Sequence, residues 1–71
     1  MEKEKRFKVE IYFVGGVVKT LHEVDGDGVA NIRHWLNGEG KATMIFVNES
    51  KESTVRRDAV MFIDVTEEAS V

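Results

Sequence analysis

Two stretches in the second half of the chain are apolar at almost every position. They are residues 42–47, Ala-Thr-Met-Ile-Phe-Val, and residues 60–65, Val-Met-Phe-Ile-Asp-Val. Because a β-strand points successive side chains to opposite faces, a strand with one wet face alternates apolar and polar residues. These two stretches hardly alternate, so each is expected to need cover on both faces. The pattern predicts only one short helix as cover, which favours a partner subunit.

The first part of the chain has the pattern of a β-hairpin. Apolar residues alternate with polar ones from Phe7 to Phe13, which predicts a half-buried strand. The pair Gly15-Gly16 predicts a two-residue turn, because such turns need positive φ angles. In that register Phe13 faces Val18 and Phe7 faces Val24. The predicted core face of the hairpin carries Phe7, Val9, Ile11, Phe13, Val18 and Val24, together with Thr20 and His22.

A helix is predicted after the hairpin, over about residues 28–37. The segment Asp25-Gly26-Asp27-Gly28 interrupts the strand, and Asp27 is the expected N-cap. Asn37-Gly38 is a typical helix end, because glycine there adopts a left-handed conformation easily. The apolar stripe at helical spacing consists of Val29, Ile32, Trp35 and Leu36.

Three further strands complete the predicted fold, at about residues 41–47, 54–57 and 60–66, with a polar loop over 48–53 and a single turn at 57–59. The fold class is α+β. We expect a small antiparallel β-sheet in ββαβββ order, built as a meander, with one helix between strands two and three. Residues 1–71 form one small domain in which residues 1–6 and 67–71 are expected to be frayed.

The faces of strands three and five are the least determined part of this prediction. The expected core residues from the second half of the chain are Ile32, Leu36, Ile45, Val47, Phe62 and Val65. A slip of one residue would exchange Ile45 and Val47 for Met44 and Phe46, because alternate residues lie on opposite faces.

The size and composition of the chain also favour self-association. A domain of about 60 residues buries only roughly 60% of the surface of its unfolded chain, so small domains commonly need an additional stabilising element. The chain has 71 residues and no cysteine, which excludes disulfides and thiolate zinc sites. We therefore expect a homo-oligomer, most simply a dimer.

The predicted oligomer interface uses the apolar residues that remain after the helix has covered its own side of the sheet. Methionine is adaptable and common at binding surfaces, so the same residues could instead receive a foreign protein. The predicted interface residues are Tyr12, Val14, Met44, Phe46, Met61 and Ile63.

The charge pattern narrows the expected partners and location. A formal net charge of −3 argues against a general nucleic-acid binder, which is usually basic. No apolar run approaches the roughly 20 residues of a membrane span. The charged N-terminal residues lack the apolar core of a signal peptide. We expect a cytoplasmic protein that does not bind membranes.

The sequence offers no set of residues typical of catalysis or metal binding. Asp25-Gly26-Asp27-Gly28 resembles the start of a calcium loop, but Val29, Ala30 and Leu36 then occupy positions that need ligands or glycine. No serine lies in a G-x-S-x-G motif, and no cysteine nucleophile exists. We therefore predict no enzymatic activity, no cofactor and no metal.

Two basic clusters are the candidate binding residues. They are Arg33-His34-Trp35 on the predicted helix and Arg56-Arg57 on strand four. Arginine and tryptophan are enriched where binding energy concentrates, and arginine pairs contact phosphates. The alternative is that Trp35 belongs to the core or to a subunit interface and that the arginines form a solvated edge.

Three functions remain open at the level of sequence. The leading hypothesis is a small homo-oligomeric interaction protein, a regulator or inhibitor that binds another macromolecule, and a phage or mobile-element origin would suit such a chain. The second is a nucleic-acid-binding sheet protein that uses Arg33, Trp35, Arg56 and Arg57. The third is an oligomer that sequesters a small anion or nucleotide between subunits with Arg33, His34 and Arg56.

Overall fold

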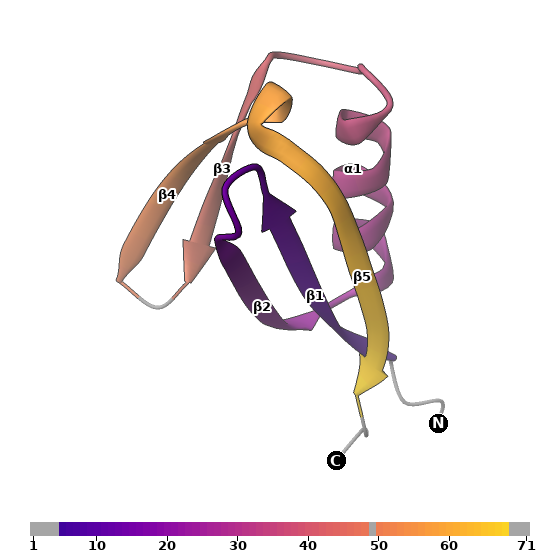
Figure 1. Ribbon diagram of the computed structural model, residues 1–71. Coiled ribbons are helices and arrows are strands. Elements are labelled where there is room, and N and C mark those ends of the chain that lie inside the picture. The colour runs from indigo at the N-terminus through magenta and orange to yellow at the C-terminus, as the bar shows by residue number, and fades with distance from the viewer. Residues whose placement is uncertain (1–4, 49, 69–71) are drawn as a thin grey trace.

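The computed structural model describes residues 5–48 and 50–68 and has the predicted order of elements (Figure 1). The α+β class and the ββαβββ order are confirmed. The helix begins two residues before the predicted position and ends one residue before it. The elements are β1 (Arg6–Phe13), β2 (Val18–Val24), α1 (Gly26–Leu36), β3 (Thr43–Asn48), β4 (Lys51–Arg56), the 3₁₀ turn η1 (Arg57–Ala59) and β5 (Val60–Glu68).

The strands form two sheets rather than the single meander that we expected. One sheet has three strands in the order β2-β1-β5, and the other is a two-stranded ribbon of β3 and β4. The turn η1 redirects the chain after β4, so β5 pairs with β1 instead of β4. A hydrogen bond of 2.9 Å from Val14 N to Ala59 O holds this turn against the β1–β2 hairpin. The meander prediction is wrong because this return to the first strand leaves no local signal in the sequence.

Strands β1 and β5 of the three-stranded sheet both reach further than expected. Arg6 pairs with Glu68, and Phe7 pairs with Glu67, so these residues belong to regular strands. Of the other residues expected to be frayed, Lys5 belongs to no strand, and residues 1–4 and 69–71 lie outside the described part of the chain. In the ribbon Asn48 already pairs with Lys51, so the expected loop over 48–53 is shorter than predicted.

The β1–β2 hairpin has a three-residue loop rather than the predicted two-residue turn. Phe13 N donates to Val17 O at 2.8 Å, and Gly16 N donates to Phe13 O at 3.1 Å. Gly15 and Gly16 have φ angles of 98° and 89°, so the glycines do supply the positive φ that the turn needs. The extra loop residue shifts the register by one, and Tyr12 rather than Phe13 faces Val18.

The shifted register exchanges the two faces of β2. Leu21 is buried opposite Val9, whereas Val18 and His22, predicted on the core face, are exposed. A bulge in β2 opposite Lys8 then restores the predicted pairing of Phe7 with Val24. Glu23 has a φ angle of 55° in this bulge. One residue gained at the loop is thus compensated at the far end of the strand.

The core is centred on β1, whose side chains Val9 and Ile11 are completely buried. Opposite residues on antiparallel strands share a face. Ile63 of β5 pairs with Ile11 of β1, so Ile63 packs against the core and its neighbour Phe62 points to solvent. The buried core consists of Val9, Ile11, Leu21, Val29, Ile32, Trp35, Phe46 and Val55.

The face of β3 is set by Val55, the single large apolar residue of β4. Val55 faces Met44 across the ribbon and is buried, so Met44 and Phe46 point inward. The predicted core residues Ile45 and Val47 are instead 61% and 66% exposed. The slip of one residue that we considered possible is therefore the arrangement that the protein adopts.

The start of α1 lies closer to the hairpin than the sequence suggested. Asp25, and not Asp27, is the N-cap, and its carboxylate accepts a hydrogen bond of 2.7 Å from Gly28 N. A Cβ on Gly28 would lie only 2.8 Å from Val24 Cγ1, so the approach of α1 to β2 requires glycine. The predicted Asn37-Gly38 end is confirmed, with Gly38 at a φ angle of 101°. Within the described residues, no helix is long and apolar enough to cross a membrane.

Burial of β1 gives a direct test of the core. Replacing Ile11 with alanine should lower the free energy of unfolding by about 2–5 kcal/mol, because it removes buried methylene groups and leaves a cavity. The exposed Ile45 provides the matched control, since Ile45→Ala should change stability by no more than about 0.5 kcal/mol. Urea denaturation followed by Trp35 fluorescence measures both. Equal effects of the two substitutions would contradict this packing.

Candidate protein-interaction surface

The predicted binding residue Trp35 is part of the core. Its side chain is 5% exposed, and its indole Nε1 donates to Lys41 O at 2.8 Å. The ring meets Phe46 edge to face, with the centroids 6.4 Å apart and the planes at 80°. Trp35 therefore connects α1 to the β3–β4 ribbon and is not available to stack on a base.

Arg57 closes the C-terminal end of α1. Its Nη1 donates to Trp35 O at 2.9 Å and to Glu39 O at 3.2 Å, and the guanidinium lies 6.0 Å from the centre of the Trp35 ring. Its backbone N donates to Ala42 O at 2.8 Å. The last carbonyls of a helix lack partners and carry partial negative charge, so a cation there is stabilising. The contacts of Arg57 are thus internal.

The other predicted binding residues are exposed but do not converge on one site. Arg56 pairs with Asp58 at 2.9 Å, and His34 Nδ1 lies 2.9 Å from a carboxylate oxygen of Glu39. Arg33 and His34 line one groove between α1 and the three-stranded sheet, and Arg56 is not part of it. The solvated-edge interpretation fits Arg56, and the set as a whole does not form a clamp for a phosphate group.

The two neighbouring arginines should differ strongly when each is replaced by alanine. Arg57→Ala removes two hydrogen bonds and a cation from the C-terminal end of α1 and should cost about 1–3 kcal/mol of stability. Arg56→Ala removes an exposed ion pair and should cost less than about 1 kcal/mol. Thermal and urea unfolding of both variants makes the comparison. A larger loss for Arg56→Ala would contradict the capping role of Arg57.

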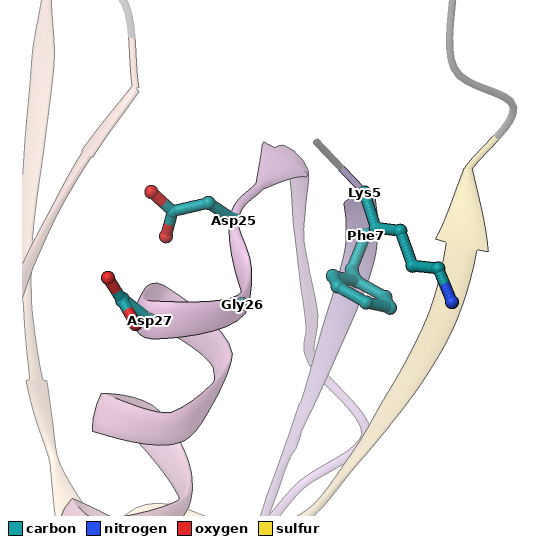
Figure 2. Close-up of a pocket in the computed structure, with 5 residues that line it drawn as sticks. All are labelled: Lys5, Phe7, Asp25, Gly26 and Asp27. Carbon is teal, nitrogen blue, oxygen red and sulfur yellow. The ribbon is translucent and has the colours of Figure 1, made fainter. Parts of the chain in front are cut away.

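A small pocket at the N-terminal end of α1 carries two aspartates (Figure 2). It is lined by Lys5, Phe7, Asp25, Gly26 and Asp27. Figure 2 shows both carboxylates on one side of the opening and the Lys5 side chain pointing away from them. The Asp25 carboxylate is already engaged as the N-cap. No group of three potential metal ligands occurs in the described parts of the chain, and the two aspartates lie at the start of the helix.

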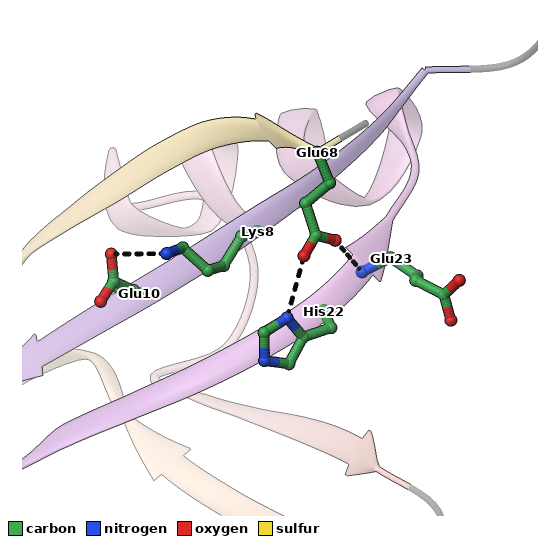
Figure 3. Close-up of polar contacts among 5 residues, drawn as sticks. All are labelled: Lys8, Glu10, His22, Glu23 and Glu68. Carbon is green, nitrogen blue, oxygen red and sulfur yellow. Dashed lines mark hydrogen bonds and ion pairs between the residues drawn. The ribbon is translucent and has the colours of Figure 1, made fainter. Parts of the chain in front are cut away.

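Glu68 connects the two edge strands of the three-stranded sheet (Figure 3). Its side chain extends from β5 across β1 to the bulge in β2. One carboxylate oxygen lies 3.0 Å from His22 Nδ1, and the other accepts a hydrogen bond of 2.8 Å from Glu23 N. The hydrogen bond with His22 and, next, that from Glu23 hold the pKa of Glu68 below its ordinary value of 4.5.

The lowered pKa of Glu68 predicts a specific sensitivity to acid. The ionised carboxylate stabilises the fold, and this contribution is complete above the ordinary pKa and is lost as the pH falls through the lowered one. Urea unfolding between pH 7 and about pH 3 should therefore show a weaker loss of stability in Glu68→Gln than in the wild type. Glu67→Gln is the matched control and should follow the wild type. Identical acid profiles for the wild type, Glu68→Gln and Glu67→Gln would contradict the stabilising role of the ionised Glu68 carboxylate.

Several exposed apolar side chains lie at the hairpin end of the three-stranded sheet, around Tyr12, which is on the face opposite the buried Ile11. Tyr12 and Phe62 stack with their ring centres 4.4 Å apart and their planes at 14°. Tyr12 pairs with Val18 of β2 on one side and with Phe62 of β5 on the other, so these three side chains form one row on the same face of the sheet. The hairpin-end patch consists of Tyr12, Val14, Val17, Val18, Met61 and Phe62, of which all but Tyr12 are exposed.

Half of the predicted interface residues lie in this patch, namely Tyr12, Val14 and Met61. Phe46 is 7% exposed, and Met44 and Ile63 are partly buried against the core, so these three do not belong to the hairpin-end patch. Val55 determines that Met44 and Phe46 lie on the buried face of β3, and pairing with Ile11 turns Ile63 inward. Sequence reasoning missed Val17, Val18 and Phe62, which the longer hairpin loop and the β1–β5 pairing expose.

The polar border of the patch is acidic beside Tyr12. Partial desolvation, followed by the charges of Glu10 and Asp64 and a hydrogen bond with Asp64, raises the pKa of Tyr12. The phenol therefore stays neutral and presents an apolar ring at neutral pH. Lys8 and Glu10 form a pair at 3.9 Å further along the same strand.

Comparison with known proteins adds no relative. No protein-family model matches the chain, and neither a curated protein nor a solved structure does. Functional inference therefore depends on the surface of the molecule itself.

Proposed function

We propose that this chain is a small, non-enzymatic interaction protein that forms a homodimer through the hairpin-end patch and regulates another macromolecule by binding it. The observation that carries the proposal is the exposed Tyr12–Phe62 stack with its apolar neighbours. Contiguous apolar surface of this kind, bordered by polar residues, marks interaction sites on soluble proteins. Aromatic residues are also enriched at the centres of interfaces.

A second copy of the chain is the occupant of the patch in this proposal. The patch lies on a three-stranded antiparallel sheet, and two such faces can stack at about 10 Å. A two-fold axis would bring the same patch of each copy together, which requires a self-complementary surface. Lys8 and Glu10 place both charge signs on the same face, so a cation of one copy can meet an anion of the other.

The two alternatives from the sequence receive less support. Nucleic-acid binding through Arg33, Trp35, Arg56 and Arg57 would need the Trp35 ring, which is buried. Sequestration of an anion by Arg33, His34 and Arg56 would need all three side chains to converge, but only Arg33 and His34 line a common groove, and His34 and Arg56 are paired with Glu39 and Asp58. A cytoplasmic location suits the proposed role, since a chain without cysteine needs no oxidising compartment.

Sedimentation velocity at micromolar concentration tests the proposed dimer. Phe62→Glu and Met61→Glu should each convert the dimer to a folded monomer, because dimer formation would bury an unpaired charge. Thr54→Glu is the control, since it adds the same charge at an exposed position of β4 and should leave the dimer intact. A wild-type protein that sediments as a monomer, or variants that remain dimeric, would overturn the proposed self-association.

A further inference from the structure

The free edges of β2 and β3 face each other across an open slot. Its walls are residues 21–24 of β2 and 44–47 of β3, its floor is Gly28, Asn31 and Ile32 of α1, and its volume is about 330 Å³. Among the described residues β2 pairs only with β1, and β3 pairs only with β4. Apart from Glu23 N in the β2 bulge, which donates to the Glu68 carboxylate, both walls of the β2–β3 slot therefore present backbone N–H and C=O groups on the side away from their paired strand.

The directions of the two walls indicate what the slot lacks. β2 and β3 both run downward in Figure 1, splayed at an angle to each other, and α1 joins the end of one to the start of the other. Two parallel strands joined by a helix either pair directly or leave room for one strand between them, as in the split βαβ arrangement. Here the strands do not pair and a cavity separates them. The arrangement is that of a split βαβ unit without its middle strand.

One added strand would join the two sheets. Placed antiparallel to β2 and β3, it would give the order β4-β3-added-β2-β1-β5, with every neighbouring pair antiparallel. The four residues on each wall offer roughly 13 Å of edge, which matches about four residues of an extended chain.

The side chains around the slot favour an apolar occupant. Leu21, Ile32 and Phe46 are buried apolar residues at its base, where inward-pointing side chains of an added strand would pack. On the outer side, Ile45 and Val47 are the exposed residues of β3 and would gain cross-strand neighbours. An added strand thus accounts for the apolar character of both faces of residues 42–47.

We propose that the β2–β3 slot binds an extended peptide segment of a partner protein by β-augmentation, antiparallel to both walls. This inference rests on the proposed function in one respect, namely that the chain acts by binding another macromolecule. A strand in the slot must pair on both of its edges. Each described strand of a second copy already uses at least one edge in its own sheet, so the proposed occupant is a different protein. The expected peptide has apolar residues at alternate or consecutive positions over about four residues. A Lys or Arg next to this apolar stretch would lie near the exposed Glu23.

Selection from a phage-displayed library of random dodecapeptides tests the proposal. The wild-type protein should enrich sequences with apolar residues at alternate or consecutive positions, and synthetic versions should bind it in calorimetry. N-methylation of alternate peptide amides should weaken binding at least tenfold, because it removes backbone donors to the slot walls. The absence of any enriched apolar sequence, or tolerance of every N-methyl group, would overturn the proposal.

Two adjacent substitutions on exposed positions of α1 locate the binding. Asn31 lines the slot, so Asn31→Trp should fill it and weaken binding at least tenfold. Ala30 lies on another groove, so Ala30→Trp is the matched control and should leave binding within twofold of the wild type. Equal effects of the two substitutions would overturn the location.

Hydrogen exchange of the bound complex gives an independent measurement. The peptide should slow exchange of amides in residues 21–24 and 44–47, and protection confined to the hairpin-end patch would overturn the slot as the site. The same titration on Phe62→Glu separates the two proposals. Loss of the dimer in Phe62→Glu with retained peptide binding supports both proposals on separate surfaces. A wild-type dimer that binds no selected peptide overturns the slot and leaves the proposed self-association standing.

Discussion

The pairing of β1 with a strand on each side is the constraint on which the remaining structure depends. Val9 and Ile11 are the two completely buried side chains, and their positions decide which residues of β2 and β5 can point inward. Because alternate residues occupy opposite faces, each neighbour of β1 has only two possible arrangements. The choice that buries Leu21 and Ile63 exposes Val18 and Phe62. The apolar surface of the protein is thus a direct result of its core.

Much of the fold could be predicted from residue spacing, and the errors have identifiable causes. The helix is correct because its apolar stripe, its acidic start and Asn37-Gly38 all agree. The hairpin register is wrong because two adjacent glycines permit both a two-residue and a three-residue loop, and one extra residue reverses a whole strand. The return of β5 to β1 is a contact between distant segments, and pattern alone could not reveal it.

The candidate site was only partly accessible to sequence reasoning for a related reason. The surplus of apolar residues was recognised, but Val55 on the polar strand β4 decides which side of β3 is buried. The basic residues were the other candidates, and the chain uses Arg57 to complete the end of α1. Residue types that often bind ligands serve here to connect a helix, a ribbon and a turn. Such a role becomes visible only once the elements are placed in space.

The position of two unpaired edges on opposite sides of one slot has a consequence for assembly. A single exposed edge can add a strand that itself offers a new edge, and this repetition is the route to fibres. A space bounded by an edge on each side is filled by one strand and then offers nothing further. The outer strand β4 carries Lys51, Glu52 and Arg56, charges that discourage edge-to-edge growth. Occupancy of the slot would therefore be saturable, with one segment for each chain, rather than the first step of polymerisation.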